Sequence, residues 1–215
     1  ASDALPLISA TRGELQLNSV AITVDALQFG ALIRTFESHR HASGTLCPAC
    51  ADGLRAALAL YHGPLLAGFS LRDSPAFEEW LLLQRERYHR LAAEGAAALS
   101  QADPGERALE YARRWAELEP LDEFAHRQVM RLLAETGQRS LALAQYESLR
   151  RTLRAELGVE PDEATRVLAE RIRSGTVGPV ATGQAAVVAG AAAPAGQPGD
   201  HFAGTVALRN EKAGR

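Results

Sequence analysis

The fold of this chain is decided by residues 105–158, which read GERALEYARRWAELEPLDEFAHRQVMRLLAETGQRSLALAQYESLRRTLRAELG. The Ala-Leu pair at 108–109 returns at 142–143, and Leu149 follows Trp115 at the same interval, since 142 minus 108 and 149 minus 115 both equal 34. A period of about 34 residues is typical of stacked helical hairpins that share one core. These residues therefore predict two helical hairpins in tandem.

The period is that of the tetratricopeptide repeat. Such a stack offers a concave surface for another protein and has no catalytic machinery of its own. We therefore predict an all-α fold of tetratricopeptide-like helical-hairpin repeats, about seven helices in all, with a short β-hairpin at the N-terminus. We expect its function to be recognition and not chemistry.

Composition narrows the class of protein. A chain of 215 residues suits one or two domains, and a hydrophobic fraction of 47% is ordinary for a globular protein. The net charge of −3 argues against non-specific nucleic-acid binding, and two cysteines do not make a disulfide framework. No run approaches the roughly 18 apolar residues of a membrane helix, so we expect a soluble, reduced, cytoplasmic protein. Because the chain starts with Ala1 and Met130 is its only methionine, we expect it to be a fragment of a longer protein.

The first 24 residues differ from those that follow. Ile8–Ala10 and Leu15–Leu17 are short strand-like runs around Arg12-Gly13, a pair suited to a turn. A further apolar alternation, Val20–Val24, predicts an extra strand. Because a lone hairpin is marginally stable in water, we expect these strands to lean on the helices or on another domain.

From Asp25 onward, apolar residues recur at helical spacing between capping residues and Gly or Pro breaks. The spacing predicts helices over residues 25–40, 48–62, 75–100, 105–119, 123–136, 139–157 and 162–174. In the third of these, apolar residues span more than one face, which predicts burial on two sides: Phe77, Trp80, Leu81 and Leu83. In the fifth, we expect four apolar residues to point inward: Phe124, Val129, Leu132 and Leu133.

These elements divide the chain into three expected parts. Residues 1–24 form the hairpin, residues 25–175 the helical-repeat domain, and residues 176–215 an Ala/Gly/Pro-rich linker or tail. The tail has too little bulky apolar surface to offset the entropy of ordering over most of its length. Residues 202–208 could still supply one strand of a following domain.

Several runs resemble a known family. They are YHGPLLAGF (61–69), AFEEW (76–80) with Arg85, AHRQVM (125–130), GQR (137–139), ALAQY (142–146) and LRAELGVEP (153–161). On these runs, residues from about 15 to 175 resemble the bacterial transcriptional activator domain of the Streptomyces antibiotic regulatory protein family and of larger relatives that carry an ATPase.

The resemblance implies a transcription-regulating module that follows a winged helix-turn-helix domain. The hairpin Ile8–Leu17 would resemble the closing wing of that domain, whose recognition helix is missing here. Sequence-specific DNA binding is therefore not carried over to this chain. What the resemblance implies is dimerisation, contact with RNA polymerase or a sister subunit, or coupling of a signal between domains.

Two histidines and two cysteines form the sharpest local cluster: His39, His41, Cys47 and Cys50. Cys-x-x-Cys lets two thiolates grip one ion from a tight turn, and the histidines can complete a tetrahedral site. A zinc ion held by all four would be structural and would join two helices across a short loop. The alternatives are two reduced thiols beside surface histidines, or a redox dithiol. An enzymatic site is not expected, because no Glu or Asp lies between residues 39 and 51 and no catalytic motif is present.

Arginines alternate with glutamates along three of the expected helices, most closely at Arg85–Arg90, Arg113-Arg114 and Arg150–Arg154. Mixed signs three or four residues apart usually form a solvated face with local ion pairs. The functional alternative is an arginine-bearing groove for an acidic helix of a partner.

The sequence thus favours a regulatory protein-interaction module of a bacterial transcriptional activator. The alternative is a generic tetratricopeptide-like scaffold that has a structural zinc site and no role in transcription. A metal-dependent enzyme is a third hypothesis, which would need an exchangeable ligand on the metal.

Overall fold

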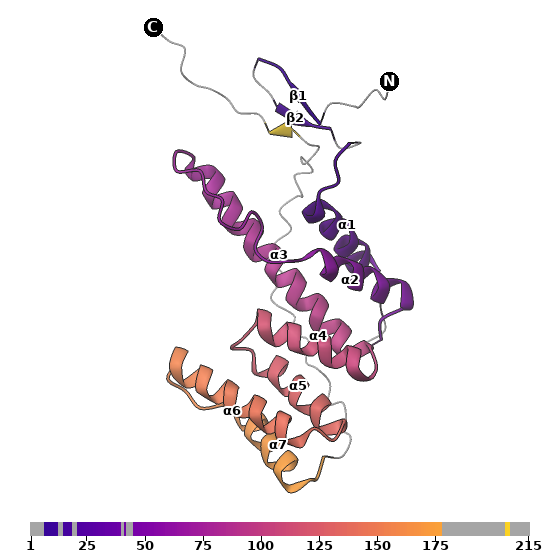
Figure 1. The fold of residues 1–215 in the computed structure, drawn as a ribbon, viewed down its shortest axis with the longest axis vertical. Coiled ribbons are helices and arrows are strands. Elements are labelled where there is room, and N and C mark those ends of the chain that lie inside the picture. Colours follow the sequence, from indigo (N-terminus) through magenta and orange to yellow (C-terminus); the bar gives the residue numbers. More distant parts are fainter. Residues whose placement is uncertain are drawn as a thin grey trace. The chain divides into compact units, whose positions relative to one another are not determined.

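A computed structural model describes residues 7–12, 15–18, 21–39, 41, 45–177 and 205–206. Within these residues the chain forms seven α-helices and three short strands (Figure 1). The helices and the strands belong to two separate compact units. The all-α helical-repeat prediction, with its N-terminal hairpin, is confirmed.

The strands form a small antiparallel sheet of order β1-β2-β3. Strand β1 (Ile8–Ala10) pairs with β2 (Leu15–Leu17), so that Ile8 lies opposite Leu17. Strand β3 (Thr205–Val206) pairs with the other edge of β2, so the strand expected for a following domain belongs instead to the same sheet as the N-terminal hairpin. The prediction of a strand over Val20–Val24 is wrong for its described residues, because the backbone turns there: Ala21 and Ile22 both donate to the carbonyl of Asn18.

The helical body contains all seven predicted helices, each ending within a few residues of its expected bounds. They are α1 (Asp25–Ser38), α2 (Pro48–Leu60), α3 (Pro75–Ala102), α4 (Gly105–Leu118), α5 (Glu123–Glu135), α6 (Arg139–Glu156) and α7 (Glu163–Ser174). Each helix packs on the next along the chain, and α7 also packs on α5 (Figure 1). This neighbour-on-neighbour arrangement is the expected geometry of a helical-hairpin stack.

Capping residues set several helix ends. Asp122 is the N-cap of α5, and its side chain accepts a hydrogen bond from the backbone N–H of Phe124. Asp162 is the N-cap of α7, and its side chain accepts a hydrogen bond from the backbone N–H of Thr165. These bonds satisfy donors that have no partner inside the helix. Gly175 ends α7 at φ 79°, a left-handed conformation that residues with a side chain rarely adopt.

The core consists of two clusters of buried side chains. One lies among α1, α2 and α3 and includes Phe29, Leu54 and Leu99. The other lies among α4 to α7, and its members include Ala108 and Ala142, the two positions related by the 34-residue period. Both alanines are buried, and their small side chains let the neighbouring helices approach closely at these positions. Trp115 packs against both clusters and so joins them.

Two predictions about burial are wrong. The first half of α3 is not covered on two sides: Leu81 is fully buried, whereas Leu82 and Leu83 are 58% and 61% exposed. Most of the buried residues of this helix lie later, between Leu91 and Ser100, although Glu94 within that stretch is exposed. Phe124 is also exposed, at 67%, because it stands in the first turn of α5 and its ring instead lies under the guanidinium of Arg127.

Candidate functional site

The candidate metal cluster lies where α1 ends and α2 begins. His39 directly follows α1, and Cys47 is the N-cap of α2, with Pro48 as the first helical residue. Because Pro fixes its own backbone and needs no N–H partner in the first turn, the helix starts sharply at this point. Cys50 lies in that first turn, so both thiols project from one helix end.

The four side chains that the sequence predicted as ligands come together. One ligand atom from each of His39, His41, Cys47 and Cys50 lies within 4.8 Å of all the others. The Nδ1 atom of His39 is 3.1 Å from the Sγ of Cys50 and 3.4 Å from the Sγ of Cys47. With zinc–sulfur and zinc–nitrogen bonds of about 2.3 and 2.0 Å, a tetrahedral site needs nitrogen–sulfur separations of about 3.5 Å. These four side chains could therefore bind a metal ion with little movement.

Burial within the cluster is graded. Cys50 is buried, Cys47 and His41 are partly buried, and His39 is exposed. The Nε2 atom of His41 is buried and has no hydrogen-bond partner among the described residues. A buried polar atom without a partner is costly, and coordination to a metal ion would satisfy it. Burial also raises the pKa of the Cys50 thiol, and the neighbouring Cys47 adds to the rise.

The chemistry of this donor set is that of a closed site. Two thiols and two imidazoles provide four ligands, which is the full number for a structural zinc site. The cluster includes no carboxylate that could act as an acid or a base. The arrangement therefore suits holding an ion between two helices.

A second feature is a groove of about 790 Å³ along α4, bordered by the residues after α2 and by the α5–α6 connection. Three carboxylates of α4 line it: Glu106, Glu110 and Glu117. None of the three is in an ion pair within the described part of the chain. Sequence reasoning missed this groove, although the stripe of glutamates at positions 106, 110 and 117 was a signal that could have indicated it.

The arginines of the predicted stripes make different contacts in the structure. Arg114 donates to the backbone carbonyls of Leu58 and Tyr61, so it fastens α4 to the end of α2 and is not free for a partner. Arg113, beside it, is exposed and lines the groove. Arg90 and Arg150 pair with glutamates of their own helices, which fits a solvated face with local ion pairs.

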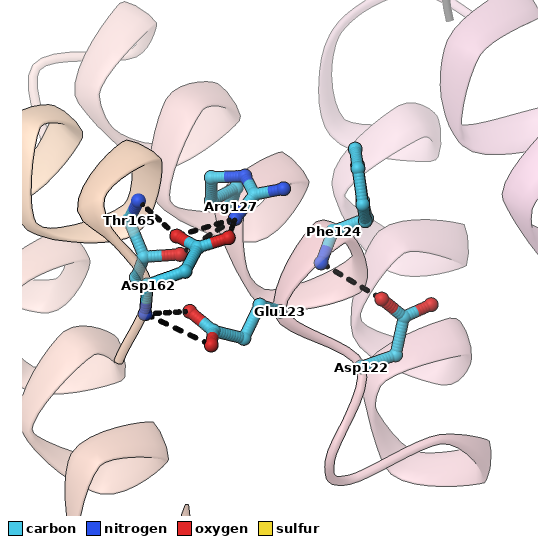
Figure 2. Close-up of polar contacts among 6 residues, drawn as sticks. All are labelled: Asp122, Glu123, Phe124, Arg127, Asp162 and Thr165. Carbon is cyan, nitrogen blue, oxygen red and sulfur yellow. Dashed lines mark hydrogen bonds and ion pairs between the residues drawn. The ribbon is translucent and has the colours of Figure 1, made fainter. Parts of the chain in front are cut away.

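A polar network that the sequence did not predict connects α5 to the start of α7 (Figure 2). Arg127 of α5 donates to both carboxylate oxygens of Asp162 and to the hydroxyl of Thr165. Glu123 accepts a hydrogen bond from the backbone N–H of Asp162. Burial would raise the pKa of Asp162, but the hydrogen bonds of Thr165 and the charge of Arg127 outweigh it and lower that pKa. Asp162 thus caps one helix and is held by another.

The fold is that of a helical-repeat protein, with an open groove along α4 and a four-ligand cluster between α1 and α2. The family model of the bacterial transcriptional activator domain matches residues 24–173. The chain belongs to this family, which is a regulatory and not an enzymatic one, and it is a module of bacterial transcriptional activators that acts with the transcription machinery. A search of curated proteins finds no match. Among the helices that the structure describes, none is long and apolar enough to cross a membrane.

Proposed function

We propose that this domain is the regulatory protein-interaction module of a bacterial transcriptional activator and that it binds a protein partner in the groove along α4. The family match supports the regulatory role. The groove supports the placement of the partner, because it is an open surface of α4, the helix that packs on both α3 and α5.

The charges of the groove suggest the chemistry of the partner. Glu106, Glu110 and Glu117 line it without ion-pair partners among the described residues, whereas Arg113 is the single exposed arginine there. Unpaired carboxylates attract a segment that carries Lys or Arg. We therefore favour a basic segment over the acidic helix that the arginines alone suggested.

RNA polymerase is the partner we favour, with a sister subunit, a second copy of the chain or a neighbouring domain as the other candidates. DNA is reached in this proposal only through a winged-helix domain like that of the Streptomyces antibiotic regulatory proteins. The net charge of −3 supports the assignment of DNA binding to another domain, since a DNA-binding surface usually has a basic excess.

The test is retention of RNA polymerase holoenzyme by the immobilised, purified chain at moderate salt. The Glu106→Lys/Glu110→Lys double variant should lose most of the retained polymerase, because it reverses the charge of the groove. Glu79→Lys, an exposed reversal on α3, is the matched control and should retain the wild-type amount.

Equal retention by wild type and the groove variant would move the contact to another surface. No retention by wild type would leave the domain as a coupler between neighbouring domains or as the generic scaffold. Mass measurement in solution would show whether a second copy occupies the groove.

We further propose that the ion at His39, His41, Cys47 and Cys50 is zinc and that its role is structural. The orphaned Nε2 of His41 and the two-thiol, two-imidazole donor set support zinc over magnesium or calcium, which prefer oxygen ligands. When bound, the ion would tie the end of α1 to the start of α2. Metal content of the purified chain tests this directly, and one equivalent of zinc is the expected result.

A further inference from the structure

We propose that Cys47 and Cys50 form a thiol switch, in which a peroxide oxidises the pair to a disulfide and thereby releases the metal ion. This inference rests on the proposed zinc site. The switch goes beyond the zinc proposal, because it makes the occupancy of the metal site depend on the oxidant.

The positions of the two sulfur atoms carry the proposal. Cys47 is the N-cap of α2, and its Sγ accepts a hydrogen bond from the backbone N–H of Cys50 at 3.4 Å. Both Sγ atoms belong to the cluster whose ligand atoms lie within 4.8 Å of one another. A disulfide needs a sulfur–sulfur distance of about 2.05 Å, so the two atoms need to approach by less than about 3 Å. Rotation of the side chains within one helical turn can supply a movement of that size.

Exposure sets the order of the two steps. Cys47 is partly exposed, whereas Cys50 is buried at 5% relative exposure. A peroxide in solution therefore reaches Cys47 first, and Cys50 lies behind it within the cluster. This is the arrangement of an attacking sulfur beside a resolving sulfur.

The reaction balances without any further reactant. The Cys47 thiolate attacks the O–O bond of hydrogen peroxide, which with one proton gives a sulfenic acid and one water. The Cys50 thiolate then displaces the hydroxyl group of the sulfenic acid, which with a second proton gives the disulfide and a second water. Each sulfur loses one electron, and the two electrons reduce the peroxide.

Loss of the metal ion follows from the loss of its ligands. Only a thiolate is an effective sulfur ligand for zinc, so the disulfide removes two of the four donors at once. His39 and His41 remain, and both belong to the segment that follows α1. Nothing in that pair holds α2, so the oxidised chain loses the metal-mediated link between α1 and α2, whereas their apolar contacts remain.

The composition of the chain makes the switch easy to measure. Cys47 and Cys50 are its only cysteines, so any disulfide within one chain is this one. In the experiment, the zinc-loaded full chain is treated with a small molar excess of hydrogen peroxide. Released zinc is followed with a chromogenic chelator, free thiols are titrated under denaturing conditions, and intact mass reports the product. We expect one zinc released for every two thiols lost, a mass lower by two hydrogens, and recovery of zinc binding after reduction by a phosphine.

Two variants separate the steps. Cys50→Ser keeps the exposed sulfur and removes the resolving one, so a sulfenic acid at Cys47 should accumulate and react with dimedone. His62→Ala removes an exposed histidine outside the cluster and should release zinc as the wild type does.

The outcomes distinguish this inference from the zinc proposal. A chain that binds no zinc before peroxide is added overturns both. A chain that binds one zinc but keeps it after peroxide treatment, or releases it with both thiols intact or with further oxidation to sulfinic acids, overturns the switch alone.

Discussion

At the scale of single residues, Asp103 joins three helices. It follows the end of α3, its carboxylate accepts two hydrogen bonds from Arg55 of α2, and Arg107 of α4 lies 3.5 Å away. Its side chain is only 4% exposed. The hydrogen bonds from Arg55 lower the pKa of Asp103 more strongly than burial raises it, and the charge of Arg107 adds to the effect.

Replacing this carboxylate should therefore destabilise the domain. We expect Asp103→Asn to reduce the free energy of unfolding by about 1–3 kcal/mol, because it leaves the partly buried guanidinium of Arg55 with only the exposed carboxylate of Asp52 as a charged partner. Asp52→Asn removes the other carboxylate that contacts Arg55, and Asp52 is 76% exposed, so its effect should stay below about 0.5 kcal/mol. Urea unfolding of the two variants checks the comparison, and equal losses would contradict it.

The same carboxylate gives the domain a defined response to acid. The pKa of Asp103 is lower in the folded chain than the ordinary value of about 3.9, so its stabilising contribution is complete above pH 4. That contribution is lost as the pH falls through the folded pKa. We expect the difference in unfolding free energy between wild type and Asp103→Asn to shrink below pH 4. A difference that stays constant into acid would show that folding does not lower the pKa of Asp103.

At the scale of elements, the cluster of His39, His41, Cys47 and Cys50 would act on the joint between α1 and α2. The apolar contacts of these helices already bury Phe29 and Leu54, and Leu46 of the connection between them packs against the same cluster. A bound ion would fix that connection, because metal binding to the folded chain adds to its stability.

Removing the ion or a ligand should therefore lower the melting temperature. We expect a strong chelator or Cys47→Ser to lower it by several degrees, since each kcal/mol corresponds to about 2–4 °C in a chain of this size. Scanning calorimetry with and without added zinc measures the effect, and His62→Ala serves as the control. An unchanged melt together with no bound metal would remove the zinc proposal.

Polar contacts join α5 and α7 at their N-terminal ends (Figure 2), in addition to the apolar cluster that the two helices share. Asp162 is at once the N-cap of α7 and the partner of Arg127. Asp122 is the N-cap of α5 and has no ion pair among the described residues, so it serves as a matched cap without the network.

A double-mutant cycle can separate the cap from the network. We expect Asp122→Ala to cost about 1 kcal/mol, the usual loss for an N-cap. Asp162→Ala should cost about 1 kcal/mol more than Asp122→Ala. Arg127→Met should reduce the free energy of unfolding by less in the Asp162→Ala background than in the wild type. Additive losses of Arg127 and Asp162 would show that the two side chains are not coupled.

At the scale of the whole molecule, the helices form a compact unit separate from the three-stranded sheet. The family match over residues 24–173 covers this unit. Its two core clusters meet at Trp115, so the seven helices should unfold as one cooperative body.

Residues 25–177 should then fold without the rest of the chain. We expect this segment to melt within about 3 °C of the full chain, because its core is complete. Calorimetry of both proteins tests the expectation, and a much lower melting temperature would show that the sheet stabilises the helices.

Much of this fold could be predicted from local sequence. The 34-residue period, the caps Asp122 and Asp162, and Pro48 after Cys47 act within a few residues of their positions, and the helices begin and end where these signals indicate. The candidate metal cluster could be predicted for the same reason, since its four residues lie within twelve positions, from 39 to 50.

The tertiary structure alone decided the contacts between distant residues. It pairs β2 with a strand near position 205, leaves Leu83 and Phe124 exposed, and directs Arg114 to the end of α2 and not to a partner. Helical periodicity shows which residues share a face, but it does not show how far a neighbour covers that face. Coverage depends on where distant segments pack, and for that reason the groove along α4 and the joint of α5 with α7 appear only in the folded chain.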